Sequence, residues 1–386
     1  MTKALDIAIA GCGPCGLAAA LLLHRDGHRV TLFERFETPR PIGSGLMIQP
    51  TGRAVLRQLG LEEALVESGA RIDRLFGRND RDRTVLDVRY GKLDAGAFGV
   101  GIHRASLFDL LHTAVAAAGI AIEGGRTIAG HEHGSLAFAD GKRAGPFDLI
   151  VDALGSRSTL APPTGRDLAY GALWASLDWT DGFDGHALEQ RYRAANRMVG
   201  VLPIGRGQAA FFWSLRADQV DAWRTAGLDV WKEEVRALWP ATAPLLDQIP
   251  DPDQLTFARY AHRTLRRPAE PGLIHLGDAW HSTSPQLGQG VNMALLDAWA
   301  LAFALREREA LGDALALALS LRRDHVALYQ LMSRLFTPVY QSDGAMLPLL
   351  RDVIVAPLTK VWPAPRVMAA MVAGIVGSPM RRLGLA

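Results

Sequence analysis

Three glycines near the start of the chain have the spacing of a phosphate-binding turn, Gly11-x-Gly13-x-x-Gly16. The apolar run from Asp6 to Ala10 precedes them and an Ala- and Leu-rich run from Leu17 follows, which predicts a buried strand, a tight turn and a helix. Gly11 permits the turn, Gly13 lets the backbone approach a pyrophosphate, and Gly16 lets the helix lie close to the strand. The free N–H groups and partial positive charge of the helix N-terminus would then face a diphosphate.

An acidic residue follows at the position that a bound ribose requires. A second apolar run, Arg29 to Phe33, predicts a strand that ends at Glu34, 23 residues after Gly11. A carboxylate there accepts hydrogen bonds from ribose hydroxyls and repels a 2′-phosphate, so the site suits FAD or NAD and not NADP. Within the turn we also expect contacts from Pro14 and Cys15, and beside the acid from Arg35.

The two cysteines of the chain, Cys12 and Cys15, lie inside this turn. Their spacing is that of a CxxC redox pair, but the turn needs small residues, so we interpret them as packing residues. One close pair cannot build a disulfide scaffold, and a reducing cytoplasm fits this composition.

The overall composition is typical of a globular enzyme. The 386 residues carry 42 basic and 40 acidic side chains, a net charge of +2, which predicts a small-molecule substrate and no nucleic-acid partner. No signal peptide and no transmembrane segment are expected. The run from Val367 to Met380 comes closest to an apolar segment, but Gly374, Gly377 and Pro379 interrupt it. We expect a buried terminal helix there, with contact to a membrane surface as the alternative.

A later segment, Gly272 to Ala298, carries the most specific pattern. It predicts a strand from Leu273 to Leu276, a turn at Gly277-Asp278, a glycine-rich loop and a helix from Val291 to Leu305. A strand-turn-helix that holds its glycines only for packing is the alternative.

This segment resembles the class A flavoprotein monooxygenases, the family that includes p-hydroxybenzoate hydroxylase. Two further segments, Gly101 to Leu111 and Asp148 to Ser158, resemble the same family, and the resemblance extends from Asp6 to about Arg306. It implies that the dinucleotide is FAD. It also implies that Asp278 binds the ribityl chain, with the rest of the turn, loop and helix start near the cofactor: Gly277, Pro285, Gly288, Gln289, Gly290, Val291 and Asn292. A helix N-terminus aimed at the flavin would stabilise the negative charge of its reduced form.

The resemblance implies further cofactor contacts. Arg104, at the start of a predicted helix, would reach the pyrophosphate and ribityl region, although it could be a surface residue. The loop from Ile42 to Pro50 would run beside the flavin ring, which places Gly45, Met47 and Gln49 there, although Met47 could equally be a core residue. A helix through Leu59-Gly60-Leu61 would support the cofactor.

The third segment departs from the family pattern. The family has an Asp-Gly pair where this chain has Leu154-Gly155, so Gly155 is still expected at the cofactor but the binding of NADH or NADPH is in doubt. A separate reductase is therefore a possible electron source. The sequence Asp152-Ala-x-Gly is also similar to flavin-dependent halogenases and to reductases related to geranylgeranyl reductase.

We predict an α/β fold of the p-hydroxybenzoate hydroxylase type, with a Rossmann-type FAD-binding domain, an inserted antiparallel β-sheet substrate domain and C-terminal helices. The expected boundaries are 1–70, 98–165 and 267–330 for the FAD domain, 71–97 and 166–266 for the substrate domain, and 331–386 for the helical region. Aromatic residues of the inserted sheet could line a substrate cavity between the two domains, although strand alternation turns about half of them away: Trp174, Tyr192, Phe211, Phe212 and Trp213. We select Trp174 and Phe212 as substrate contacts.

No metal site or hydrolase nucleophile is predicted. His275 and His281 lack the spacing of zinc ligands, and we interpret both as structural residues. Ser156 and Ser158 lack the Gly-x-Ser-x-Gly setting.

The expected activity is that of an FAD-dependent monooxygenase. With O2 and NADH or NADPH it would hydroxylate or epoxidise an electron-rich aromatic or polyketide-like compound through a flavin C4a-hydroperoxide, chemistry that the cofactor carries. No catalytic base can be named from the sequence. The alternatives are halogenation, reduction or dehydrogenation on the same scaffold, and a redox-sensing FAD protein without turnover.

Overall fold

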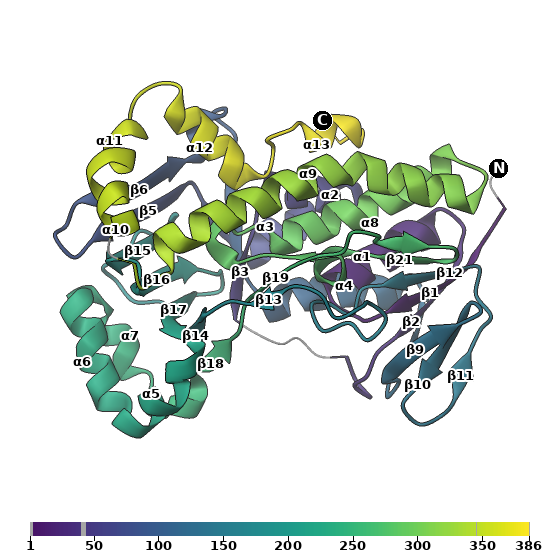
Figure 1. Cartoon of the computed structure of the whole chain (residues 1–386), viewed down its shortest axis with the longest axis horizontal. Coiled ribbons are helices and arrows are strands. Elements are labelled where there is room, and N and C mark those ends of the chain that lie inside the picture. The colour runs from purple at the N-terminus through teal and green to yellow at the C-terminus, as the bar shows by residue number, and fades with distance from the viewer. Residues whose placement is uncertain (1–2, 40–43, 345, 386) are drawn as a thin grey trace.

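The computed structural model describes residues 3–39, 44–344 and 346–385. Two larger sheets lie at opposite ends of the molecule, and long helices run between them (Figure 1). This arrangement agrees with the predicted fold class. The domain boundaries predicted from the sequence stay a prediction.

The first sheet has six strands, in the order β20 (Ala269–Glu270), β21 (Leu273–His275), β12 (Leu149–Asp152), β1 (Asp6–Ala10), β2 (Arg29–Phe33) and β8 (Ala121–Glu123). All neighbours pair in parallel except β20 with β21. The central strand β1 is buried almost throughout, as its apolar sequence predicts. Ala10 pairs with both Phe33 and Asp152, so the carboxyl ends of three strands meet at one edge. Ligands bind at this edge in open α/β sheets.

Several helices share one contiguous apolar core with this sheet, and they pack on the sheet or on one another. They are α1 (Pro14–Arg25), α2 (Pro50–Gln58), α3 (Glu62–Ser68), α4 (Arg104–Ala117) and α8 (Gly290–Glu307). Helix α1 begins three residues before the predicted start, because Pro14 already has the dihedral angle φ that a first helical residue needs. The predicted helix through Leu59-Gly60-Leu61 is wrong: α2 ends at Gln58, and Gly60 has φ +75° in the turn before α3.

The second sheet has seven strands: β18 (Thr256–Ala258), β14 (Tyr170–Asp178), β17 (Gln208–Arg216), β16 (Arg197–Pro203), β15 (Ala187–Arg193), β5 (Arg74–Asn79) and β6 (Thr84–Arg89). The predicted antiparallel sheet has one exception among its pairs, since β15 and β5 pair in parallel. These two strands come from segments more than a hundred residues apart, so no hairpin constrains their direction. Helices α5 (Val220–Ala226), α6 (Leu228–Leu238) and α7 (Ala243–Asp247) lie beside this sheet, and residues of α6 and α7 share an apolar core with β14, β16 and β17.

Three smaller sheets complete the β structure. One joins β3 (Gly45–Ile48), β7 (Gly99–His103) and β4 (Ala70–Ile72); a second joins β13 (Arg166–Asp167), β19 (Ala261–Thr264) and β22 (His281–Ser282); a third joins β11 (Arg143–Ala144), β10 (Ser135–Phe138) and β9 (Ile128–Glu132).

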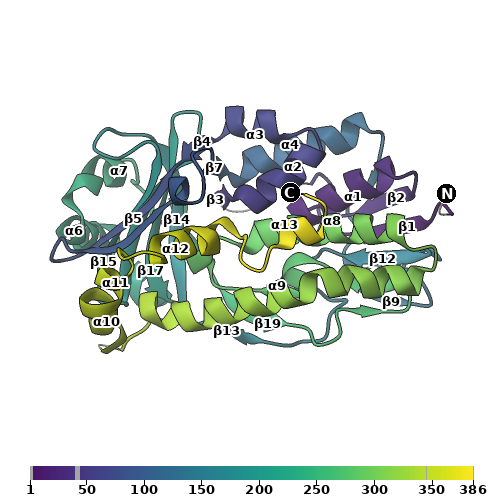
Figure 2. The same ribbon diagram turned by 90° about the horizontal axis from the view of Figure 1, so that it is seen from above.

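Helix α9 (Leu311–Tyr340) runs alongside α8 and reaches the second sheet (Figure 2). It spans the predicted boundary at residue 330. Short helical segments follow it: α10 (Met346–Leu350), a π-helical turn (Arg351–Val355), α11 (Ala356–Leu358), α12 (Ala364–Ala373) and α13 (Pro379–Arg382). The predicted terminal helix from Val367 to Met380 is interrupted, because Gly374 ends α12 in the left-handed conformation at φ +81°. None of the helices in the described ranges is long and apolar enough to cross a membrane.

Candidate active site

A cavity of about 640 Å³ opens at the carboxyl ends of β1, β2 and β12. Most residues predicted to hold the cofactor line it: Gly11, Gly13, Pro14, Cys15, Glu34, Arg35, Arg104, Gly155, Asp278, Gly290 and Val291. They come from segments that lie far apart in the sequence and meet only through the parallel sheet.

The glycine turn closes one end of this cavity. Gly11 has φ +104°, and a Cβ atom there would lie 2.8 Å from the carbonyl oxygen of Ala153. A Cβ atom on Gly13 would meet no atom of the described residues within 4 Å, so the backbone is open to a ligand. Gly16, the third glycine of the predicted cofactor turn, does not line the cavity: it is buried against Gly11, where a Cβ atom would lie 2.0 Å from the Gly11 carbonyl oxygen. Its absence of a side chain positions the helix and not the ligand.

The carboxylate of Glu34 is held at the rim of the cavity by two backbone N–H groups. Oε2 accepts a hydrogen bond from Cys12 at 3.1 Å, and Oε1 accepts one from Phe36 at 3.2 Å. Arg35 stacks over the Phe36 ring, with its guanidinium carbon 4.6 Å from the ring centroid. The acid is therefore oriented before a ligand binds, with acceptor capacity left for ribose hydroxyls.

A second cavity of about 340 Å³ adjoins the first. Five residues line both cavities: Leu46, Arg104, Asp278, Gly290 and Val291. The side chains of Arg104 and Asp278 make no hydrogen bond or ion pair with any residue in the described part of the chain. The side chain of Asp278 is exposed to the cavities, but desolvation by the surrounding protein raises the pKa of its carboxyl group, although His281 and Arg104 oppose the shift. The junction of the cavities thus carries one acid and one base that are free to bind a ligand.

Residues of the second sheet, the loop before α8, and helices α9 and α12 surround the second cavity. Trp174 and Phe212 both line it, with ring centroids 4.7 Å apart, and so does Tyr192. Phe211 and Trp213 point to the opposite side of β17, into the core against α6. Strand alternation thus divides the five aromatic residues as expected.

Residues predicted to lie beside the flavin ring gather on this second cavity: Gly45, Met47, Gln49, Pro285, Gly288 and Gln289. Residues 42 and 43, at the start of the predicted ring-facing loop, lie outside the described residues. Tyr90 donates its hydroxyl proton to Gln49 Oε1, which leaves the buried Nε2 of Gln49 without a partner in the described chain. An unpaired buried donor at a cavity wall suits a ligand with an acceptor atom.

Asn292 and Gly277, both predicted as cofactor contacts, line neither cavity. Asn292 accepts a hydrogen bond from the Gln49 N–H at 2.8 Å and donates to the carbonyl oxygens of Met47 and Gly288. Its side chain therefore joins the segment around Met47 to the loop before α8. Gly277 is buried and donates its N–H to Asp297 Oδ2 at 3.0 Å. Both positions were inferred from the motif, which does not distinguish a ligand contact from a residue that positions one.

The Leu154-Gly155 turn, which departs from the family pattern, is also held in place by buried residues. Asp152 is buried and accepts hydrogen bonds from the Leu154 N–H at 3.0 Å and the Ser158 hydroxyl at 2.6 Å. His275 Nδ1 lies 2.6 Å from the same carboxylate. His275 is therefore a structural residue, and the turn presents Leu154 and Gly155 to the first cavity.

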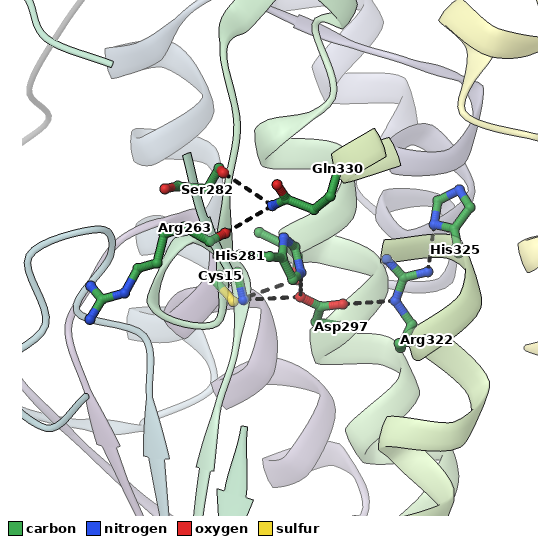
Figure 3. Close-up of polar contacts among 10 residues, drawn as sticks. Cys15, Arg263, His281, Ser282, Asp297, Arg322, His325 and Gln330 are labelled. Atoms are coloured by element: carbon green, nitrogen blue, oxygen red, sulfur yellow. Dashed lines mark hydrogen bonds and ion pairs between the residues drawn. The ribbon is translucent and has the colours of Figure 1, made fainter. Parts of the chain in front are cut away.

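Behind the Gly277-Asp278 turn, a buried network joins α8, α9 and the C-terminal segment (Figure 3). Asp297 accepts hydrogen bonds from Arg322 Nε and from His281 Nε2, both at 2.7 Å. Burial alone would raise the pKa of Asp297, but His281 and Arg322 outweigh it and hold the pKa at about 2. Arg322 Nη1 lies 2.9 Å from His325 Nδ1, and His325 Nε2 donates to the Gly374 carbonyl oxygen.

His325 predicts a pH dependence of stability. Burial and the neighbouring Arg322 lower its pKa to about 3. In the folded chain His325 therefore stays neutral at pH values where the unfolded chain protonates it, near pH 6.5 and below. Its contribution to the free energy of unfolding is complete above pH 6.5 and is lost as the pH falls toward 3. When the pH is lowered from 6.5 to 5, the free energy of unfolding of the His325→Gln variant should fall by about 2 kcal/mol less than that of the wild type.

Chemical denaturation of both proteins across this pH range measures the effect. The exposed His24→Gln variant is the control and should follow the wild type. Parallel pH profiles for the wild type and His325→Gln would show that His325 is not held neutral.

The two cysteines lie in a packed environment. Both are buried and free. Burial, with the Glu34 charge beside it, raises the pKa of Cys12 to about 12, and burial raises that of Cys15 well above its usual value. A thiolate is the reactive form, so the packing interpretation agrees with the structure.

Several cavity residues were missed by the sequence analysis. Phe36, Phe108, Arg126 and Thr127 line the first cavity, and Gln190, Tyr260, Phe336, Tyr340, Met368 and Met371 line the second. Most lie in strands or helices without a motif, and only the fold brings them to the cavities. No group of residues suited to a metal ion is found in the described ranges.

These features fit FAD: a glycine turn with an open backbone, an oriented acid for ribose, an unpaired Asp278 where the two cavities meet, and the orphaned donor of Gln49 in the second cavity. Fold and site together define a flavoprotein of the Rossmann type with a second cavity beside the cofactor site. The FAD binding domain family matches residues 4–326, and the chain belongs to it.

This chain has oxygenases among its relatives. It is 30% identical to aurachin C monooxygenase/isomerase from Stigmatella aurantiaca over 82% of this chain and 84% of that protein. It is 28% identical to 3-amino-4-hydroxybenzoate 2-monooxygenase from Streptomyces cremeus over 79% of both chains. The solved structure of 2-methyl-3-hydroxypyridine-5-carboxylic acid oxygenase superposes with a TM-score of 0.82 at 20% identity, over 98% of both chains, and shows the same fold.

This chain is therefore an FAD-dependent monooxygenase and a flavoprotein oxidoreductase. Nothing among these relatives supports the halogenase alternative.

Proposed function

We propose that this monooxygenase hydroxylates or epoxidises a neutral, apolar aromatic or polyketide-like compound in the second cavity. The observation that carries the proposal is the charge of the cavity wall. Among the described lining residues, Arg104 and Asp278 are the only charged ones, and both also line the first cavity. Arg40 lies outside the described residues.

A substrate carboxylate would need a cationic partner in this cavity. Burying an unpaired carboxylate is strongly unfavourable, and Arg104 is the one candidate among the described lining residues. If Arg104 binds the cofactor, none of them is left for the substrate. The remaining wall is aliphatic, aromatic or uncharged polar, which favours a neutral ligand.

For the cofactor we propose that the glycine turn binds the pyrophosphate, Glu34 the adenosine ribose, and Asp278 with Arg104 the ribityl region. Gln49 Nε2 and the Pro285–Gly290 loop would contact the flavin ring. When bound, FAD supplies the activation of O2 and the transfer of one oxygen atom to the substrate. The apolar wall of the second cavity excludes water from that step.

Tyr260 is the best placed residue to orient a substrate oxygen. Its hydroxyl oxygen accepts a hydrogen bond from Trp174 Nε1 at 2.9 Å, and both residues line the second cavity. Burial raises the pKa of Tyr260 to about 12, although the Trp174 hydrogen bond and Arg104 oppose the shift. The hydroxyl therefore keeps its proton near neutral pH and donates it, rather than acting as a base.

Matched ligand pairs test the proposal. FAD-loaded protein is titrated with aromatic phenols and with the same compounds bearing a carboxylate, and binding is followed by the change in the flavin spectrum. The neutral member of each pair should bind at least about tenfold more tightly, because its partner must lose carboxylate hydration without a cation in return. Preference for the carboxylates would overturn the proposal and point to Arg104 as a substrate anchor.

Two neighbouring phenylalanines on β17 give a matched pair of variants. Phe212 contacts the cavity and Phe211 the opposite core. Phe212→Leu should weaken binding of an aromatic ligand roughly fivefold, since about 1 kcal/mol of ring contact is lost. Phe211→Leu should lower the melting temperature and leave ligand affinity unchanged. Equal effects of both variants on affinity would place the ligand elsewhere.

We further propose the cytoplasm as the compartment, supported by the two free thiols. NADH or NADPH is the expected electron donor, and a separate reductase stays an alternative because Leu154 replaces the acid of the family pattern.

A further inference from the structure

The exposed apolar side chains of this protein are concentrated in one segment. Of the fourteen large hydrophobic residues that are exposed in the described chain, ten lie between residues 346 and 367. Trp362 is 83% exposed and Met346 is 78% exposed. We call the exposed side chains of residues 346–367 the C-terminal apolar surface. It covers α10, α11 and the start of α12, at one end of the molecule beside β5, β6 and β15 (Figures 1 and 2).

The helical run from Met346 to Leu358 has its charged residues turned inward. Arg351 is 1% exposed, donates to the carbonyl oxygens of Ala194 and Val339, and lies over the Tyr192 and Tyr340 rings. Its neighbour Asp352 accepts hydrogen bonds from Arg351 and from Asn79. Leu349, Val353, Ile354 and Leu358 face outward instead. A helix at a protein surface normally exposes its charged residues and buries its apolar ones, and this helical run does the opposite. Large exposed apolar surfaces of this kind mark interaction sites.

The free charges on and beside this surface are positive. Lys360 and Arg366 are exposed and form no ion pair with a described residue, and the same holds for Arg334 on the adjoining part of α9. The two acids of the region, Asp343 and Asp352, are paired with Arg216 and Arg351. The surface therefore combines apolar side chains, an exposed tryptophan and unpaired cations.

We propose that the C-terminal apolar surface docks on an anionic lipid bilayer. Aliphatic side chains would enter the boundary of the acyl chains, Trp362 would lie at headgroup depth, and the cations would face lipid phosphates. A second copy of the chain fits less well. A two-fold contact brings the same patch of both copies together, so the unpaired cations would meet one another without a compensating acid.

The C-terminal apolar surface lies close to the second cavity, so docking on a bilayer would bring that cavity near the lipids. Met368 and Met371 of α12 line that cavity, and Tyr340, under Arg351, does too. Helix α12 begins within the C-terminal apolar surface, and its following residues are part of the cavity wall. An apolar substrate dissolved in the bilayer would be close to its binding site, but the docking proposal stands without the proposed substrate class.

Vesicle co-sedimentation of the FAD-loaded full chain tests the docking. The probes are vesicles of phosphatidylcholine alone and of phosphatidylcholine with phosphatidylglycerol. The wild type should partition onto the mixed vesicles at least about tenfold more strongly than a Leu358→Ser, Val361→Ser, Trp362→Ser variant, since three apolar contacts are lost. The matched control is Val66→Ser, Val230→Ser, which removes exposed apolar side chains elsewhere and should bind like the wild type.

A second variant separates the electrostatic contribution to vesicle binding from the apolar one. Lys360→Gln with Arg366→Gln should weaken binding to the mixed vesicles only, and added salt should erase that difference. Absence of wild-type binding, or equal binding by the triple serine variant, would overturn the proposal. A wild-type dimer in light scattering that the triple variant converts to a monomer would assign the surface to self-association instead.

Discussion

Replacing Asp297 by alanine is expected to lower the free energy of unfolding by about 3–5 kcal/mol, the usual effect of breaking a buried ion pair from one side. The side chain of Arg322 is 1% exposed, and Asp297 is its only carboxylate partner in the described chain. The substitution leaves the guanidinium charge buried without compensation and also removes the acceptor for His281 and for the Gly277 N–H. Equilibrium denaturation at neutral pH measures the loss.

Asp324 on α9 provides the control, because it also pairs with an arginine. The Asp324–Arg382 pair is 3.2 Å long, but its side chains are 77% and 51% exposed. Asp324→Ala should change stability by less than about 1 kcal/mol. If both alanine variants lose the same free energy, the buried network does not stabilise the junction of α8 and α9.

The second large effect concerns the cofactor. Asp278→Ala is expected to raise the FAD dissociation constant roughly 10- to 150-fold, because hydrogen bonds to a charged acceptor contribute about 1.5–3 kcal/mol. The side chain of Asp278 makes no hydrogen bond or ion pair with the described residues, so the cofactor-free variant should be as stable as the wild type. Fluorescence titration of the cofactor-free protein with FAD measures the affinity.

A variant that loses FAD affinity but keeps its stability identifies a ligand contact and not a residue needed for folding. Asp313→Ala, at an exposed position near the start of α9, should change neither quantity. A variant at Asp278 that binds FAD normally would remove this residue from the proposed cofactor site, whereas unfolding of the cofactor-free variant would give it a structural role.

The sequence predicts the first sheet well because its signals are local. The strand bounds of Asp6–Ala10 and Arg29–Phe33 agree with the structure, and the glycine turn forms where predicted. Burial on both faces imposes a continuous apolar run, and the turn imposes glycine at Gly11, where φ is positive. Phe211 and Phe212 separate as the two-residue period of a strand requires.

Contacts that depend on the tertiary fold could not be predicted in this way. Asn292 and Gly277 have the residue types of a cofactor loop, but buried hydrogen bonds consume their polar groups. The parallel pairing of β5 with β15 joins segments that no local pattern connects. Helix α12 supplies Met368 and Met371 to the second cavity from a part of the chain that carries no motif.

With its bound FAD, this chain should transfer one atom of O2 to an organic substrate. The most direct measurement is anaerobic reduction of the FAD-loaded protein by NADH or NADPH, followed by mixing with 18O2 and the ligands that bind in the titrations. Mass spectrometry of the products should show one labelled oxygen atom per molecule. A modified product without the label, or consumption of O2 to hydrogen peroxide alone with every ligand that binds, would contradict the claim.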